Sequence, residues 1–489
     1  MKKVCILGSG VSGSILAKEL SDKFDVTVVD CDKLDLPFNN ETSLEKFLDS
    51  NLKKQKFVGY GFGGTTNLWH GVLTQMDPED IKAISDKTGL NLNKELKEKL
   101  HRLEEYFGDL SFLNDGKLDK NKLSQFMDLE SLGIKKYVHM TRPARFRKII
   151  RLLKNRGRIN TMECAVATSL HFEKDSDVVK YLKIRKNGKE KKVFSDLFIV
   201  ATGGLESPRL LLQSFENSRH HNVITGTGLM DHPHTTIGSF TIPKYIFYTQ
   251  HGTRSVLFSN SSRVGYTIPK KYRRLKNLNH SLYIRPSLVK NIDQVKEDIK
   301  LLISSKFSFN LLLKILSRPT LLLSAFILLS ERFGFGIYTN LFNIHMHLEQ
   351  SIDNCSSVTL SHHEDRHGRR IPKIHRSFSE DSIKDILHIQ SFVKDLIGDS
   401  CTFRGVEITK RKLDSGAHFS GTCRLGKTQK NSVVDKNLKY HSMKNLFVCD
   451  ASVIPKTGNS NLSLTIALLA LRLSDYLNKK YNGENKKNN

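Results

Sequence analysis

The chain has 489 residues, 38% of them hydrophobic and 26% charged, which is an ordinary balance for a globular protein of two or three domains. Lysine and arginine number 77 against 50 acidic residues, and the net charge of +27 predicts attraction to an anionic surface or substrate unless it is compositional bias. Because no zinc-ligand spacing or RNA-binding signature accompanies this charge, nucleic acid is not expected as a partner.

The cysteines and the N-terminus bear on the cellular compartment. The seven cysteines are scattered and odd in number, with no CxxC pair, which argues against a disulfide framework and favours a reducing, cytoplasmic location. The apolar run Val4–Leu7 is shorter than the core of a signal peptide. We therefore expect the N-terminus to begin the fold itself.

The first predicted unit is a strand, a glycine-rich turn, a helix and a second strand. Residues 2–7 indicate a buried strand, residues 14–23 a helix, and residues 25–30 a strand that ends at Asp30. The turn GSGVSG places glycines at 8, 10 and 13, and in this context the pattern indicates a dinucleotide site. Its backbone could approach a pyrophosphate at the helix N-terminus, and Asp30 could bind a ribose. The alternative is a glycine turn in an unrelated α/β fold.

The later elements predict a second domain inserted into the first. Residues 76–154 are expected to be a mostly helical connecting segment, and strands and a helix follow up to 214. Beyond 236 the pattern changes to alternating strands, and after 415 it returns to a buried strand and an apolar helix. We expect an α/β fold with a doubly wound βαβ domain over 1–75, 155–235 and 415–480, an inserted α+β domain on an antiparallel sheet over 236–414, and a disordered tail over 481–489.

Residues 305–330 are the most apolar part of the inserted domain. Polar side chains recur there every four residues, at Lys306, Asn310, Lys314 and Arg318. They would share one face of a helix that ends before Pro319. The uncharged run 319–330 is shorter than the roughly 20 residues that span a bilayer. The segment therefore predicts either helices at a membrane interface, making the protein peripheral at a membrane, or a hairpin packed on its own domain.

Seven motifs resemble one protein family and occur in that family's order. They are GSGVSG (8–13), GGTTNLWHG (63–71), ATGGLESPRLLLQS (201–214), GLMDHP (228–233), LEQSIDNCSSVTLS (348–361), HFSGTCRLG (418–426) and NLFVCDASVIPKTGNSNLSLT (445–465). Together they resemble the glucose–methanol–choline oxidoreductases, flavoenzymes that oxidise alcohols. The GGTTNLW form is most similar to the branch that acts on sugars and polyols.

The resemblance implies FAD as the cofactor. Its expected contacts are Gly8, Gly10, Ser12 and Gly13 at the pyrophosphate, Asp30 at the ribose, Val166 at the adenine, Gly64, Thr65, Thr66, Asn67, Trp69 and His70 along the pyrophosphate and isoalloxazine, and Asp450, Ala451, Asn461 and Leu462 on the ribityl and pyrimidine side. Sugar-oxidising relatives bond a histidine that precedes the tryptophan to the flavin. Here Leu68 stands at that position, and the resemblance therefore implies non-covalent FAD.

Two residues match the family's catalytic pair. His418 corresponds to the catalytic histidine, and Asn461, 11 residues after Asp450, to the second His or Asn. Imidazole, with an ordinary pKa of about 6.5, suits removal of a hydroxyl proton. Asparagine does not titrate, so the base would be His418, while Asn461 would bind the substrate oxygen. The alternative is that His418 is a hydrogen-bonded structural histidine, as His232 is expected to be.

These residues predict an FAD-dependent oxidoreductase that oxidises a hydroxyl group by hydride transfer to flavin N5. The substrate would be a sugar, a polyol or a lipid-linked alcohol. The sequence does not indicate whether oxygen, a quinone or another protein accepts the electrons. The alternatives are a flavin-containing lyase without net redox and a non-catalytic membrane-associated flavoprotein. The histidine-rich stretches 345–347 and 362–367 lack the spacing of a closed metal site, and no metal is expected.

Overall fold

The computed structural model describes residues 1–31, 58–113, 122–140, 143–249, 260–291, 294–295, 297–298, 301–302, 308–333, 335–353 and 355–482. The expectations for Lys306 and for most of the 481–489 tail concern residues outside these ranges. Two large sheets, of five and seven strands, organise the described part of the chain.

The first domain is built on a five-stranded parallel sheet. Its order is β17 (Leu446–Val448), β9 (Leu197–Val200), β1 (Lys3–Leu7), β2 (Asp25–Val29) and β5 (Asn160–Met162). The helices α1 (Val11–Leu20) and α10 (Ser463–Asn482) pack on each other, and α5 (Gly203–Phe215) follows β9. Strands β1, β9 and β17 are buried almost throughout, as expected for a parallel sheet covered on both faces.

A small antiparallel sheet extends this domain. It consists of β6 (Ala165–Phe172), β7 (Val179–Lys186) and β8 (Lys189–Phe194), and α5 packs against β6. The carboxyl ends of β1, β2, β9 and β17 meet at one edge of the parallel sheet. Ligands of open α/β sheets bind at that edge.

The second domain is built on a seven-stranded sheet. Its order is β16 (Thr402–Gly405), β10 (His234–Tyr248), β13 (Ile337–His347), β12 (Ser281–Ser287), β11 (Ser261–Thr267), β4 (Gly133–His139) and β3 (Val72–Leu73), and every neighbouring pair is antiparallel. Helix α9 (Glu380–Asp395) covers one face, where Ile386 and Ile389 join Phe240 and Ile284 in one apolar core. The expected α/β architecture with an antiparallel sheet domain is confirmed.

Two segments depart from the predicted outline. The connecting segment 76–154 contains the expected helices α2 (Pro78–Thr88), α3 (Leu92–Phe107) and α4 (Arg147–Asn155), but it also supplies β4 to the sheet of the second domain. The hairpin of β14 (Ser357–Glu364) and β15 (Arg370–His375) lies within the inserted range yet packs against α5 of the first domain. Hydrophobic patterning alone does not reveal such exchanges between domains.

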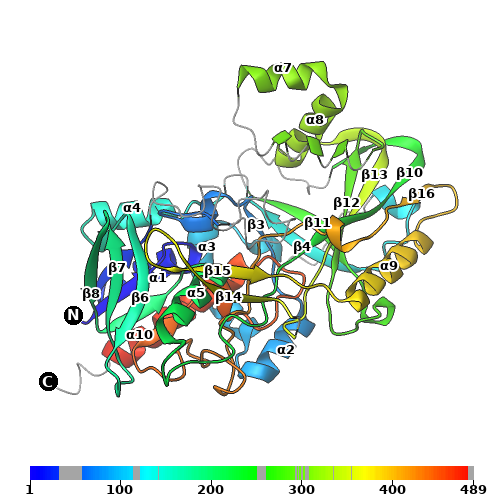
Figure 1. Cartoon of the computed structure of the whole chain (residues 1–489). Helices are drawn as coiled ribbons and strands as arrows, with labels where there is room; N and C mark the ends of the chain where they lie inside the picture. The colour runs from blue at the N-terminus through cyan, green and yellow to red at the C-terminus, as the bar shows by residue number, and fades with distance from the viewer. Residues whose placement is uncertain are drawn as a thin grey trace.

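A helical pair projects from the second domain, at the top of Figure 1. It consists of α7 (Phe309–Ser317) and α8 (Pro319–Phe333), so Pro319 begins a new helix as its fixed backbone angle favours. Among the described residues no single helix is long and apolar enough to cross a membrane. The pair Phe309–Ser317 and Pro319–Ser330 meets those criteria only jointly, and it is bent by 111°.

Candidate active site

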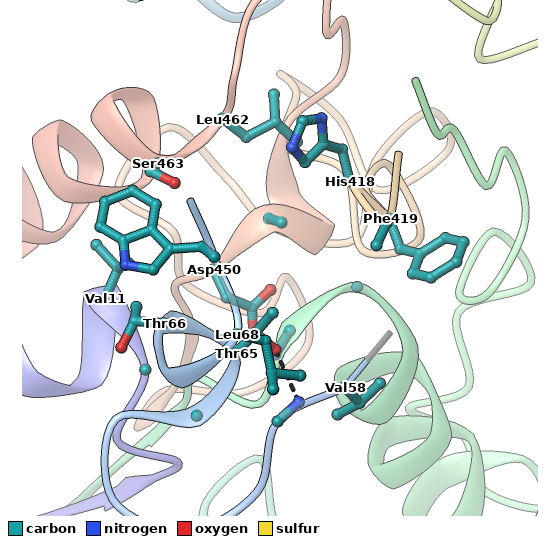
Figure 2. A pocket seen from close by; sticks show the side chains of 18 of the residues that line it. Val11, Val58, Thr65, Thr66, Leu68, His418, Phe419, Asp450, Leu462 and Ser463 are labelled. Carbon is teal, nitrogen blue, oxygen red and sulfur yellow. Dashed lines mark hydrogen bonds between the residues drawn. The ribbon is translucent and has the colours of Figure 1, made fainter. Parts of the chain in front are cut away.

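A cavity of about 780 Å³ joins the two domains. Its wall includes the glycine-rich turn after β1, the loop before β3, the start of α10, and strands β4, β10, β11, β12 and β13. Figure 2 shows His418 and Leu462 on one side of this cavity and Thr65 and Thr66 on another. Residues more than 400 positions apart in the chain therefore share one site.

The glycine-rich turn leaves room for a ligand. Gly8 has a φ of +94°, and a side chain there would meet the carbonyl oxygen of Ala201 at 2.6 Å. Among the described residues, no atom lies within 4 Å of a Cβ placed on Gly10, and Gly10 itself offers no side chain to cap the N-terminus of α1. Open space beside unpaired helical N–H groups suits a pyrophosphate. The turn thus fits the phosphates of a dinucleotide.

Gly13 has a different role from Gly10. A Cβ there would lie 2.0 Å from the carbonyl oxygen of Gly8, and the residue does not line the cavity. Its absent side chain lets α1 pack closely on the end of β1. Gly13 therefore shapes the site without facing it.

Residues 58–71 form the loop that carries the tryptophan. Its turn Gly64–Asn67 is fixed to the glycine-rich turn by a 3.1 Å hydrogen bond from the Gly63 amide to Oγ of Ser9, and Ser9 donates to Asp30. Trp69 donates from Nε1 to the carbonyl of Ala144 at 2.9 Å and contacts the ring of Phe107. Trp69 is held rigidly where it borders the cavity.

The structure does not place Asn67 in the cavity wall. Its amide nitrogen donates to the carbonyl oxygen of Phe62 at 3.0 Å, which turns the side chain back into its own loop. All other expected contact residues except Gly13 line the cavity. They are Gly8, Gly10, Ser12, Asp30, Gly64, Thr65, Thr66, Trp69, His70, Val166, His418, Asp450, Ala451, Asn461 and Leu462.

His418 and the buried His232 form an imidazole pair. Their Nδ1 atoms lie 2.9 Å apart, and Nε2 of His232 lies 2.8 Å from the carbonyl oxygen of Gly458. A carbonyl only accepts, so Nε2 of His232 carries the hydrogen. Burial, with the charge of His418, lowers the pKa of His232 to about 3, and His232 is therefore neutral with one N–H.

This arrangement fixes the tautomer of His418. Nδ1 of His232 has no hydrogen and accepts, so Nδ1 of His418 must donate. The lone pair of His418 is therefore on Nε2, which lies 3.5 Å from the side-chain amide nitrogen of Asn461. His232, expected to be merely structural, orients the basic nitrogen of its neighbour.

The buried Asp231 holds the backbone of His418 in place. Its carboxylate accepts the backbone amide of His418 at 2.9 Å and the hydroxyl of Ser415 at 2.6 Å, and it pairs with Arg376 at 3.5 Å. Burial lowers the pKa of His418 below its usual 6.5, and the charge of Asp231 opposes this. His418 is therefore neutral at pH 7 and able to take up a proton.

Asp450 closes the end of β17. Its carboxylate accepts from the Gly203 amide at 2.9 Å and from the hydroxyl of Ser207 at 2.5 Å, and it caps the turn that begins at Ala451 through the amide of Ser452. Burial raises the pKa of Asp450, and these donors oppose the rise. The carboxylate joins β17 to α5 at the cavity edge.

Several cavity residues were not anticipated from the sequence. They are Tyr137, His139, His234, Arg263, Tyr283, Arg285 and His347. They lie on β4, β10, β11, β12 and β13, and alternation along the strands directs them away from the core under α9. Polar residues at every second position of 281–287 were a signal for this wall. Among the described residues, no group of three or more His, Cys, Asp or Glu is arranged to hold a metal.

A parallel sheet, an open glycine-rich turn and a cavity at the sheet's carboxyl edge are typical of the dinucleotide-binding class of α/β proteins. A family model for GMC oxidoreductases matches residues 354–470. An oxygen-dependent choline dehydrogenase of Staphylococcus xylosus is 40% identical over 77 residues, which are 15% of this chain and 14% of that protein.

A second relative is matched over most of its own length. A protein of Acanthamoeba polyphaga mimivirus, described as a truncated, inactive GMC-type oxidoreductase, is 44% identical over 62 residues, 12% of this chain and 70% of that protein. An FAD-dependent oxidoreductase from Chaetomium thermophilum has the same fold, with a TM-score of 0.61 at 14% identity over 99% of this chain and 100% of that one. The chain belongs to the GMC oxidoreductase family, and the resemblance seen in its motifs is confirmed.

Proposed function

We propose that this protein is an FAD-dependent oxidoreductase that converts a hydroxyl group of a sugar, polyol or lipid-linked alcohol to a carbonyl group. The observation that carries the proposal is the lone pair on Nε2 of His418, oriented by His232 and next to the amide of Asn461 in the cavity that continues to the glycine-rich turn. The open space at Gly10 and the uncapped N-terminus of α1 fit the pyrophosphate of FAD.

Bound FAD supplies an acceptor for the hydride that leaves the alcohol carbon. The chain supplies the proton chemistry: Nε2 of His418 takes the hydroxyl proton, and Asn461 donates a hydrogen bond to the substrate oxygen. His418 then carries hydrogens on both nitrogens, while Nδ1 still donates to His232 and the nearby Asp231 stabilises the positive charge.

We propose that FAD is held without a covalent bond. Leu68 borders the cavity with 44% of its surface exposed, and its side chain has no nucleophile. Leu68 stands where the sugar-oxidising relatives carry the histidine that they bond to the flavin, and His70, which also lines the cavity, lies at a different position of the motif. Acid precipitation should release the yellow colour into the supernatant, and colour retained in the pellet would contradict this proposal.

The experiment that tests the function is anaerobic mixing of the FAD-loaded protein with a panel of sugars, polyols, sterols and long-chain alcohols. Bleaching of the flavin absorbance by one class, with formation of the matching aldehyde or ketone, supports the proposal. Product formation without bleaching favours a lyase of the same fold. If no alcohol of the panel bleaches the flavin or is converted to a product, the result favours a non-catalytic flavoprotein.

We further propose that the helical pair α7–α8 rests on an anionic membrane surface. Its exposed apolar side chains are Phe309, Leu312, Leu313, Leu316, Leu322, Leu323, Phe326, Leu329 and Phe333. Lys314 and Arg318 flank them, and residues 308–330 contain no acidic side chain. Apolar surface edged by positive charge is complementary to anionic lipid headgroups over acyl chains. With the reducing compartment expected from the cysteines, this proposal places the protein at the cytoplasmic face of a membrane.

A further inference from the structure

The loop 456–461, just before α10, supplies two of the groups that surround the proposed base. The carbonyl oxygen of Gly458 lies 2.8 Å from Nε2 of His232, which donates to it. The side chain of Asn461, at the other end of the loop, lies 3.5 Å from Nε2 of His418. The position of this loop therefore determines both the tautomer of the base and the place of the neighbouring amide.

Ionisable side chains that lie outside the cavity hold this loop. They are Asp77 and Asp80 at the start of α2, Lys135 on β4, Glu349 just after β13, and Lys456 of the loop itself. Asp80, Lys135 and Glu349 are buried, and none of these described side chains lines the cavity. Burying such groups costs free energy unless they are paired and hydrogen-bonded. A cluster of them next to a functional loop therefore calls for a role.

The second half of the loop is tied to this cluster through its side chains. Asn459 donates from Nδ2 to Asp77 at 3.1 Å, and Nζ of Lys135 donates to Oγ of Ser460 at 2.8 Å. Lys135 also pairs with Asp77. These contacts fix the course of the chain just before Asn461.

Glu349 holds the backbone of the loop at the residue that contacts His232. Its Oε1 accepts the amide of Gly458 at 2.9 Å and the ammonium group of Lys456 at 2.7 Å. Its Oε2 accepts the backbone amide of Asn279 at 2.6 Å. Gly458 is thus held on both sides, by Glu349 at its N–H and by His232 at its carbonyl oxygen. These two contacts fix the direction of the carbonyl group.

The close approach of α2 requires a glycine at position 458. Gly458 has a φ of +58°, and a Cβ there would lie 2.1 Å from Oδ2 of Asp80. Asp80 is itself held by Lys456 at 3.2 Å and by the side-chain amide of Asn279 at 3.0 Å. The loop therefore lies against a fixed surface and cannot shift toward α2.

The contact between Glu349 and Gly458 is compatible with either protonation state of the carboxyl group. Burial raises the pKa of Glu349 to about 7, the charge of Asp80 adds to the rise, and that of Lys456 opposes it. Oε1 faces the two donors named above, whereas Oε2 faces the single amide of Asn279. A proton would therefore reside on Oε2, and Oε1 would still accept from Gly458.

We propose that Glu349 is a positioning residue of the active site, which acts through Gly458 on the tautomers of His232 and His418. With the Gly458 carbonyl fixed, His232 keeps its hydrogen on Nε2, and the lone pair of His418 stays on Nε2. Without Glu349 the carbonyl can turn, and both rings can exchange their tautomers. The catalytic consequence rests on the proposed function, whereas the order of the hydrogen bonds does not.

The first test reads the tautomers without any reaction. The FAD-loaded protein is labelled with ¹⁵N in its histidine rings, and two-bond ¹H–¹⁵N spectra show which ring nitrogen carries the hydrogen. His232→Gln and His418→Asn identify the signals of the pair by their loss. In the unmodified protein, His232 should carry its hydrogen on Nε2 and His418 on Nδ1.

Variants of Glu349 separate its position from its charge. Glu349→Met removes the acceptor, so both histidines should show two tautomers in exchange. Glu349→Gln loses the charge but keeps an oxygen at the same reach, and should preserve the fixed tautomers. Glu349→Asp keeps the charge on a shorter side chain and should lose them, which provides the test if the Met variant does not fold. Fixed tautomers in the Met and Asp variants, or their loss in the Gln variant, would overturn the proposal.

A second buried carboxylate controls for a loss of stability alone. Asp365 accepts the backbone amides of His367 at 2.8 Å and Arg369 at 3.0 Å, and it pairs with Arg209. Asp365→Asn should lower the unfolding temperature, because it breaks a buried ion pair, and should leave the tautomers unchanged. If Asp365→Asn disturbs the tautomers as much as Glu349→Met does, the effect is merely structural and the proposal is wrong.

The rate of anaerobic flavin reduction then tests the catalytic consequence. At saturating alcohol and equal FAD content, Glu349→Met should lower this rate about 10- to 10²-fold, because a misplaced base slows the reaction of bound substrate. Glu349→Gln should retain most of the rate. Altered tautomers with an unchanged rate would refute the proposed function and leave the role of Glu349 in the hydrogen-bond order intact. Fixed tautomers with a lowered rate would refute the role of Glu349 and leave the proposed function intact.

Discussion

At the scale of single residues, the chemistry depends on where two hydrogens lie in the pair His232–His418. The Gly458 carbonyl accepts from Nε2 of His232, and this one contact determines the direction of the next hydrogen bond and the position of the lone pair on His418. The amide of Asn461 and the carboxylate of Asp231 complete the surroundings. In the proposed mechanism His232 would therefore set the reactivity of His418 without moving a proton itself.

The pH dependence of flavin reduction follows from the surroundings of His418. The base must be neutral, and burial lowers the pKa of His418 below 6.5 while Asp231 opposes this only in part. The folded enzyme therefore keeps the neutral form to lower pH than free imidazole would. We expect a rate constant of reduction that is level around pH 7 and falls only below pH 6.5, measured by anaerobic stopped-flow mixing. A midpoint clearly above 6.5 would show that another group titrates.

His232 is predicted to act as a positioning residue. His232→Leu removes the acceptor for Nδ1 of His418, so the basic nitrogen loses its fixed orientation and the reduction rate should fall about 10²-fold with FAD retained. His232→Gln offers an amide oxygen as acceptor and should restore part of the rate. The measurement is the reduction rate over pH, normalised to flavin content. Equal rates in the Leu and Gln variants would exclude the positioning role.

At the scale of elements, the glycine-rich turn 8–13 between β1 and α1 contains one glycine that packs against the protein and another that faces the cavity. Gly13 adjoins the backbone of Gly8, whereas Gly10 faces the open cavity. The two glycines of one motif should therefore respond differently to the same substitution.

Gly10→Ala should weaken FAD binding while leaving the unfolding temperature of the cofactor-free protein unchanged, because its Cβ meets no atom of the described residues within 4 Å. Gly13→Ala should lower that unfolding temperature, because its Cβ would lie 2.0 Å from the Gly8 oxygen. Calorimetry with and without FAD measures both effects. A Gly10 variant that keeps full affinity for FAD would place the pyrophosphate elsewhere.

The pair α7–α8 gives a prediction for membrane binding. Phe309, with 72% of its surface exposed, should enter the lipid interface, so Phe309→Asp should reduce co-sedimentation with vesicles containing phosphatidylglycerol about tenfold or more. The control Phe194→Asp, on β8 and 59% exposed, should not. Pure phosphatidylcholine vesicles should bind less than anionic ones.

Two outcomes would contradict the membrane proposal. One is equal sedimentation of both variants with anionic vesicles. The other is a dimer in light scattering that Phe309→Asp converts to a monomer, which would show that a second copy covers the helices.

Whether residues meet within one local unit or through the pairing of distant strands explains which parts of the site the sequence could predict. The cofactor side was predictable because the glycines of 8–13 and Asp30 belong to one local unit whose spacing is set by a strand and a helix. The wall with Arg263, Arg285 and His347 was not, because these residues meet only through the register of β11, β12 and β13. The orientation of Asn67 was also not predictable, because its side-chain amide donates a hydrogen bond to the backbone carbonyl of Phe62, five residues earlier, and not toward the cavity.

At the scale of the whole molecule, two sheets contribute different functions to one cavity. The parallel sheet presents glycines and a helix terminus where a dinucleotide would bind, and the antiparallel sheet presents rings and guanidinium groups where a substrate would bind. His418 and Asn461 come from the C-terminal part of the chain, which contributes β17 and α10 to the first domain. Under the proposed function, the insertion of one domain into the other would bring cofactor and substrate to the same base.

The measurement that tests this account most directly is the rate of anaerobic flavin reduction in His418→Ala, compared with the unmodified protein at equal FAD content. The alcohol used is the one that bleaches the flavin fastest. Loss of the general base predicts a rate lower by about 10²- to 10⁴-fold with FAD still bound. An unchanged reduction rate would contradict the assignment of His418 and, with it, the mechanism proposed for this cavity.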